Sequence, residues 1–207
     1  MLLLINNETY KHLLVESQLS VSNIIENTIE ICDSRLKDSI SSSEVILSLQ
    51  LYSAMLDTSF AQLPSKKLLR LPLLLIPSLV STHNPQFMSG CDVLRSLLRA
   101  LQLYPNSDLI PTICDLFIQL FQPFLSRFLV HFVPLTHTSS SCLLGMQLEL
   151  SKGSAFVARG CLRTLSMLFE FFQDTMRDGI PQLIELITKC VGYRETFVLT
   201  EVTCTGF

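Results

Sequence analysis

Residues 91–121 read CDVLRSLLRALQLYPNSDLIPTICDLFIQLF, and residues 158–190 read ARGCLRTLSMLFEFFQDTMRDGIPQLIELITKC. In the first stretch, leucines recur at helical spacing, namely Leu94, Leu97, Leu98 and Leu101. Polar residues occupy the opposite side of the same pattern, which indicates one buried and one exposed face. After a turn at residues 104–107, a second apolar stripe begins beyond Asp108. Each stretch therefore predicts two amphipathic helices joined by a turn.

The two stretches resemble each other in register. Leu94-Arg95-Ser96-Leu97 recurs as Leu162-Arg163-Thr164-Leu165, at an offset of 68 residues. The segment DLIPTICDL at 108–116 recurs as DGIPQLIEL at 178–186, at an offset of 70 residues. Chance similarity between amphipathic helices is the alternative. Two matches in the same order favour helical repeats of about 35–47 residues, which must stack because each pair buries only part of its apolar surface.

This layout resembles the HEAT/armadillo superfamily of helical repeats over roughly residues 20–192. The motifs are degenerate, since the regular Asp and Arg positions of a well-formed HEAT repeat do not appear in every unit. The resemblance implies an all-α fold of stacked antiparallel helical hairpins, an irregular α-solenoid that binds other proteins and has no inherent catalysis. Large proteins of this kind serve nuclear processes such as genome maintenance or meiosis, and also transport and trafficking.

Upstream of the repeat, three further helical stretches are predicted. Residues 22–37 place Ile24, Ile25, Thr28, Cys32 and Leu36 on one stripe. Residues 45–56 follow a capping-box spacing at Ser41 and Glu44 and are apolar nearly all round, which is typical of a helix buried on both sides. Residues 66–80 predict a helix that is broken or kinked at its two prolines, Pro72 and Pro77.

Downstream, residues 81–90 are rich in turn formers and predict a loop. In the helix that begins after Asp108, we expect an inward stripe of Ile113, Leu116, Phe117, Leu120 and Phe121. We expect an outward face of Thr112, Asp115, Gln119 and Gln122, and we expect Pro123 to end this helix. Pro181 falls in the first turn of a later helix, and Gly192 falls at its C-terminal cap.

The predicted organisation is a single helical-repeat domain at residues 1–192, followed by a non-helical or disordered tail at 193–207. The chain opens with an apolar run at residues 1–5, and the tail is rich in β-branched residues. A solenoid ends in polar-faced capping repeats, and neither end has that character. We therefore expect a fragment of a longer solenoid, in the form of a truncated or alternatively spliced isoform.

The composition is unusually apolar, with 48% hydrophobic and 16% charged residues, against about 25% charged in typical soluble domains. Either helices are buried on more than one side, or the chain enters a membrane. A span needs about 20 apolar residues, whereas the run at 68–80 is short and is interrupted by Arg70 and two prolines. No membrane span or export signal is expected. A membrane-associated helical protein in trafficking or transport is the alternative function.

Seven cysteines form no CxxC pair, which indicates a reducing compartment, the cytoplasm or the nucleus. The net charge of −3 shows no excess of basic residues of the kind that direct nucleic-acid binding requires. The sequence contains no GxSxG, HExxH, GxxxxGK[ST] or GxGxxG motif, and its four histidines are scattered. We therefore predict no enzyme, with no catalytic residues, no cofactor, no metal site and no small-molecule substrate. A small-molecule enzyme of unknown type is the third class considered.

The predicted function is a non-enzymatic scaffold whose partners are other proteins. The candidate partner-binding residues are Arg95 and Arg99, because cations four residues apart lie on one helix face and could receive an acidic partner. The alternative is a solvated face on which Asp92 pairs with Arg95 at i, i+3 spacing.

Overall fold

The computed structural model describes residues 7–38, 41–104, 108–128 and 155–190, and every regular element in these ranges is helical. The helices are α1 (Asn7–Asp38), α2 (Ser42–Ser59), α3 (Ser65–Leu79), α4 (Asn84–Leu103), α5 (Leu109–Phe128), α6 (Ala155–Phe171), α7 (Gln173–Met176) and α8 (Ile180–Cys190). Two 3₁₀ turns lie at Phe60–Gln62 and Arg177–Gly179. The all-α prediction is confirmed for the described part of the chain.

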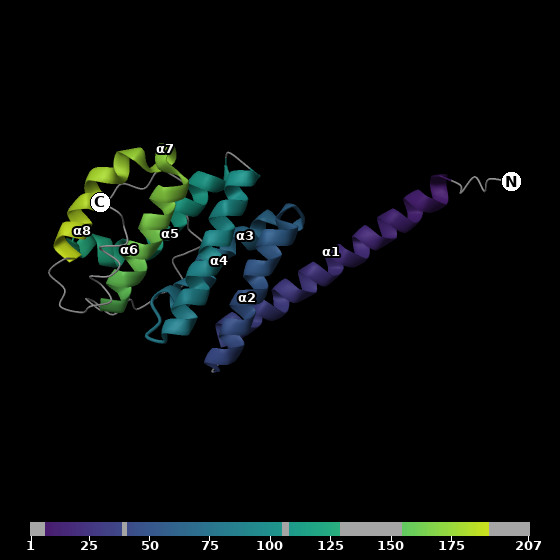
Figure 1. Ribbon diagram of the computed structural model, residues 1–207, viewed down its shortest axis with the longest axis horizontal. Coiled ribbons are helices and arrows are strands. Elements are labelled where there is room, and N and C mark those ends of the chain that lie inside the picture. The colour runs from purple at the N-terminus through teal and green to yellow at the C-terminus, as the bar shows by residue number, and fades with distance from the viewer. Residues whose placement is uncertain (1–6, 39–40, 105–107, 129–154, 191–207) are drawn as a thin grey trace.

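The helices alternate between two layers as the chain proceeds (Figure 1). In one layer, α4 packs between α2 and α6. In the other layer, α3 packs between α1 and α5, and α5 also contacts α8. Contacts of α1 with α2, α3 with α4, α5 with α6 and α6 with α8 join the layers. The N-terminal part of α1 projects away from the other helices, so only its C-terminal part belongs to the stack.

The core lies between the two layers and includes apolar stripes at helical spacing. In α4, the four predicted leucines are fully buried. In α6 and just beyond it, the buried residues at this spacing are Ala158, Cys161, Leu162, Leu165, Leu168, Phe169 and Phe172. The prediction of an amphipathic helix with one buried face is confirmed for both. Each such side chain contributes about 1.5–3 kcal/mol of hydrophobic stabilisation relative to an exposed one. The fold is therefore favoured in which the apolar face of each helix is buried, and helical periodicity identifies that face.

The two similar stretches, 91–121 and 158–190, have similar burial in their first helices, α4 and α6, and different burial in their second helices, α5 and α8. Leu94 and Leu97 in α4, like Leu162 and Leu165 in α6, are fully buried, and the two helices share a layer. In the second helices the pattern diverges, because Asp115 of α5 is buried whereas its counterpart Glu185 of α8 is exposed. The helices α6 and α8 pack against each other, whereas α5 packs mainly against α3 and α6.

The proline predictions need correction where they expected a helix to break or end. Pro72 and Pro77 lie inside α3, and Pro123 lies inside α5, yet both helices continue through them. A proline in a helix interior costs about 3 kcal/mol through a lost hydrogen bond and a steric clash. In α3 this cost is offset by burial of neighbouring side chains, since Leu71 and Leu75 are fully buried against the other helices. Tertiary packing thus overrides the local signal.

The predicted loop at 81–90 is also wrong beyond residue 83. Helix α4 begins at Asn84, with Pro85 in its first turn, where a missing N–H costs nothing. Gly90 lies inside this helix and packs against α3, so that a Cβ atom there would lie 3.1 Å from the Cβ of Ser78. The glycine that suggested a loop therefore allows close packing of α4 against α3.

Burial was assigned to the wrong face at several positions. In α2, Leu47 and Leu51 are 53% and 42% exposed, so this helix is buried on one side only. In α1, Ile25 and Cys32 of the predicted stripe are buried, whereas Ile24 is 61% exposed and the unpredicted Ile29 is buried. In α5, Leu116 is only half-buried, and Asp115, expected outside, is 1% exposed. Long apolar runs do not reveal which side of a helix faces its neighbours.

Several sequence predictions lie outside the described residues. These are the apolar start at 1–5, the C-terminal cap at Gly192 and the tail at 193–207. The 3₁₀ turn at Arg177–Gly179 and the position of Pro181 in the first turn of α8 agree with the predicted turn and helix start.

Helix α6 lies very close to α3 at Gly160. A Cβ atom at this position would overlap the backbone carbonyl oxygen of Leu79, near the C-terminal end of α3. The neighbouring Arg159 is buried and donates a hydrogen bond of 2.7 Å to the carbonyl oxygen of Ser81, while its guanidinium lies 3.7 Å from the ring centre of Phe87. Together these two residues fix α6 against the connection between α3 and α4.

Candidate functional site

A buried polar cluster joins the first three helices. Asp33 of α1 is 6% exposed, and its Oδ1 atom accepts a hydrogen bond from the hydroxyl of Tyr52 in α2. Its Oδ2 atom lies 3.7 Å from Nζ of Lys67 in α3, and the same ammonium lies 3.8 Å from Oε1 of Glu30. A buried carboxylate is tolerated only when it is paired and hydrogen-bonded. Asp33 satisfies both conditions through partners on two other helices.

The tyrosine in this cluster stays protonated. Burial, and then the hydrogen bond to Asp33, raises the pKa of Tyr52 above its usual range. The hydroxyl therefore remains a donor to Asp33 at neutral pH and well above it. This hydrogen bond links α1 to α2 and holds in place the face of α1 that contacts α3.

Removing this donor is expected to destabilise the fold. Tyr52→Phe leaves one oxygen of the buried Asp33 carboxylate without its partner, which should lower the unfolding free energy by about 1–3 kcal/mol. The matched control is Tyr104→Phe, because Tyr104 is exposed and keeps its ring stacked on Phe60 after the change. Urea unfolding at pH 7 measures the unfolding free energy of both variants. Equal stability of the two variants would show that the buried hydrogen bond contributes nothing.

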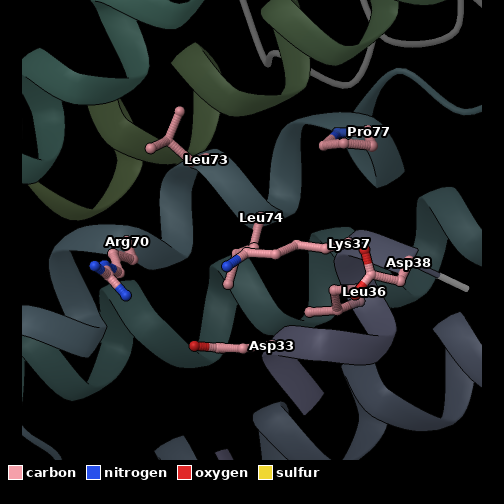
Figure 2. Close-up of a pocket in the computed structure, with 8 residues that line it drawn as sticks. All are labelled: Asp33, Leu36, Lys37, Asp38, Arg70, Leu73, Leu74 and Pro77. Carbon is pink, nitrogen blue, oxygen red and sulfur yellow. The ribbon is translucent and has the colours of Figure 1, made fainter. Parts of the chain in front are cut away.

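A cavity of about 550 Å³ lies beside this cluster, between the C-terminal part of α1 and α3 (Figure 2). Its lining consists of Asp33, Leu36, Lys37, Asp38, Arg70, Leu73, Leu74 and Pro77. The volume falls within the range of about 300–1,000 Å³ that is typical of ligand pockets. Four lining residues are apolar and four are charged, so the cavity combines an apolar wall with a small number of polar groups.

The charged residues of the cavity are unevenly distributed. In Figure 2 the amino group of Lys37 extends across the cavity toward the side where Arg70 lies, while the carboxylate of Asp38 lies at the other end. Asp38 accepts a hydrogen bond of 3.4 Å from Ser34, and Asp33 is held by its cluster. Neither Lys37 nor Arg70 forms an ion pair with any residue in the described ranges. Figure 2 places the carboxylate of Asp33 on the same side as Arg70 and the amino group of Lys37, but Tyr52 and Lys67 already contact that carboxylate. We call this side, with Lys37 and Arg70, the cationic end of the cavity.

The wall formed by α3 also has an altered backbone. Pro77 carries no N–H group, so the carbonyl oxygen of Leu73 lacks the hydrogen bond that residue 77 donates in an ordinary helix. Both residues line the cavity.

The candidate residues taken from the sequence lie elsewhere. Arg95 and Arg99 are both on α4 and do not line the cavity. Nη1 of Arg95 lies 3.7 Å from Oδ1 of Asp92, as the alternative solvated-face interpretation expects, and Arg99 is exposed.

Sequence reasoning missed the cavity because its residues come from two helices more than thirty positions apart. The one available signal was Arg70, a charged residue inside the most apolar stretch of the chain.

The cysteine side chains in the described ranges are buried. Cys32, Cys91, Cys114, Cys161 and Cys190 form no disulfide within these ranges. Burial raises the pKa of Cys32 to about 11 and those of Cys114 and Cys190 to about 12. Since the thiolate is the reactive form, the raised pKa values lower the reactivity of Cys32, Cys114 and Cys190 at neutral pH.

We expect this burial to appear directly in alkylation kinetics. At pH 8 a pKa shift from 9.0 to about 12 lowers the thiolate fraction of Cys114 about a thousandfold. Brief iodoacetamide treatment of the folded chain, followed by peptide mapping, should leave these five cysteines unmodified, and treatment in urea should modify all of them. Rapid modification of Cys114 or Cys161 without urea would contradict the packing of α5 and α6.

No protein-family model, curated protein or solved structure matches this chain. Among the described helices, none is both long enough and apolar enough to cross a membrane. Within the same ranges, no group of three His, Cys, Asp or Glu side chains has the geometry to hold a metal ion. The α1–α3 cavity, with its apolar wall and charged lining, is the candidate site.

Proposed function

We propose that this chain is a non-enzymatic protein-binding scaffold, built as an irregular α-solenoid, whose α1–α3 cavity receives a segment of a partner protein. Two features support the solenoid. From α1 to α6 the helices alternate between two layers, and each layer grows by adding the next helix but one. Stacked helical repeats use the extended surface of one layer to bind partners. The cavity lies between neighbouring helices of a single layer, where such a surface would form.

The cavity is the observation that carries the proposal. Leu73 is half-buried and Pro77 is exposed, so the apolar wall is accessible to a side chain from outside. A few convergent polar groups around an apolar wall are typical of sites that fix the orientation of a ligand. The five buried cysteines, which form no disulfide within the described ranges, favour a reducing compartment, and we propose that the scaffold acts in the cytoplasm or nucleus.

Site-specific crosslinking tests this function. The photoreactive residue benzoylphenylalanine is placed at Leu73 in the cavity, or at Leu51 on the exposed face of α2 as a control. After irradiation in cell extract, we expect a discrete set of proteins to crosslink through position 73 and not through position 51. Excess wild-type chain should compete, and excess Leu73→Glu chain should not.

Identical crosslinks from both positions would overturn the proposal, as would the lack of any crosslink at position 73. Flotation of the unmodified chain with phospholipid vesicles, without a protein crosslink at position 73, would favour membrane association instead.

A further inference from the structure

We propose that the α1–α3 cavity selects an acidic partner segment, with a carboxylate bound between Lys37 and Arg70 and an apolar side chain packed on Leu36, Leu73 and Leu74. This inference rests on the proposed function and adds the chemistry of the partner to it. The occupant is a peptide segment of another protein that carries Asp or Glu next to a large apolar residue.

The charge argument follows from which lining groups are already engaged. Both carboxylate oxygens of Asp33 have partners, on Tyr52 and Lys67, and Asp38 contacts Ser34 at the far end of the cavity. Lys37 and Arg70 are exposed and form no ion pair within the described ranges. An anionic group that enters the cationic end meets two uncommitted donors, and Arg70 can bind a carboxylate through two parallel hydrogen bonds.

The apolar argument separates a peptide from other anions. Leu36, Leu73, Leu74 and Pro77 form half of the lining, and a free phosphate or a nucleotide phosphate would leave them without a partner. An apolar side chain beside a carboxylate covers them. Peptide N–H groups also match the carbonyl of Leu73, which Pro77 leaves without its helical partner. A membrane surface fits less well, because it is bound by protruding basic and apolar residues and not by a recess between two helices.

The experiment uses three labelled ten-residue peptides that share a Leu-Leu centre and differ only in the flanking residues, which are Glu, Gln or Lys. Fluorescence anisotropy measures their affinity for the full chain. We expect the Glu peptide to bind at least tenfold more tightly than the Gln peptide, and the Lys peptide to bind most weakly. The affinity of the Glu peptide should fall as salt is raised, because exposed charges are screened.

Matched variants locate the bound peptide. The double variant Lys37→Gln/Arg70→Gln should lose at least tenfold in affinity for the Glu peptide and little for the Gln peptide. Lys66→Gln, which removes an exposed cation from the same helix but outside the cavity lining, should change the affinity less than twofold. Circular dichroism confirms that the variants remain helical. Because Lys37 and Arg70 are exposed, their replacement leaves the core intact.

The outcomes separate this inference from the proposed function. Equal binding of the Glu and Gln peptides, both weakened by Leu73→Glu, would overturn the acidic selectivity and leave the protein-binding cavity in place. Binding that is insensitive to the double variant would overturn the site. If none of the peptides binds, or if only phosphatidylserine vesicles bind, the acidic-segment proposal is wrong, and crosslinking at position 73 decides the proposed function separately.

Discussion

Replacing Gly160 by alanine is expected to lower the free energy of unfolding by about 3 kcal/mol, at the upper end of the usual cost of overpacking. The added methyl group would overlap the carbonyl oxygen of Leu79, a backbone atom that cannot rotate away. Helix α6 would have to separate from α3, and the contacts of Arg159 with Ser81 and Phe87 would be strained at the same time. Alanine favours a helix over glycine by up to about 1 kcal/mol, and the steric cost exceeds this gain.

Gly90→Ala is the matched control, because it makes the same change in the interior of a neighbouring helix. There the new methyl group would lie 3.1 Å from the Cβ of Ser78, a contact that a shift of a few tenths of an ångström relieves. We expect a net effect within about 1 kcal/mol for Gly90→Ala, since helix propensity offsets the strain. Thermal and urea unfolding measure both variants. If Gly160→Ala is as stable as Gly90→Ala, α6 and α3 do not approach each other as described.

The second large effect is expected at the centre of α6. Leu165 is fully buried, and truncation to alanine removes three carbon atoms and leaves a cavity, at a cost of about 2–5 kcal/mol. Arg99→Ala, on the exposed side of α4, should stay within about ±0.5 kcal/mol. The comparison is made by urea unfolding at constant pH and salt. Small and equal effects at the two positions would mean that the inward faces of these helices are assigned wrongly.

The leucine stripes of α4 and α6 could be predicted because several residues in each helix indicate the same buried face. Leu94, Leu97, Leu162 and Leu165 recur at a spacing that only a helix places on one face, and the opposite faces carry charges. Helix type and core face therefore follow from local pattern alone. The same reasoning failed in α2, where Leu47 and Leu51 make the pattern apolar on every side and no polar face marks the orientation.

Helix boundaries were predicted less well where proline or glycine dominates the local pattern. Helix α5 continues past Pro123, and helix α4 contains Gly90. Packing against neighbouring helices compensates for the low helix propensity of these two residues. Such compensation depends on neighbours that are distant in the sequence. Asp115 is a similar case, since its burial depends on how α5 packs against α3 and α6 and not on its own helix.

The candidate site could not be predicted because it is a product of tertiary packing. Lys37 and Arg70 become neighbours of one cavity only when α1 packs against α3, and this packing depends on the contacts of Asp33 with Tyr52 and Lys67. Local charge spacing selected Arg95 and Arg99 instead, and spacing on one helix contains no information about a cavity between two.

The proposed binding at the α1–α3 cavity is tested most directly by hydrogen–deuterium exchange of the chain alone and with the protein captured through position 73. We predict slower exchange in residues 30–38 and 65–79 on binding, and unchanged exchange in α6, which lies in the other layer. Protection confined to α4 or α6, with residues 30–38 and 65–79 unaffected, would contradict a partner site between α1 and α3.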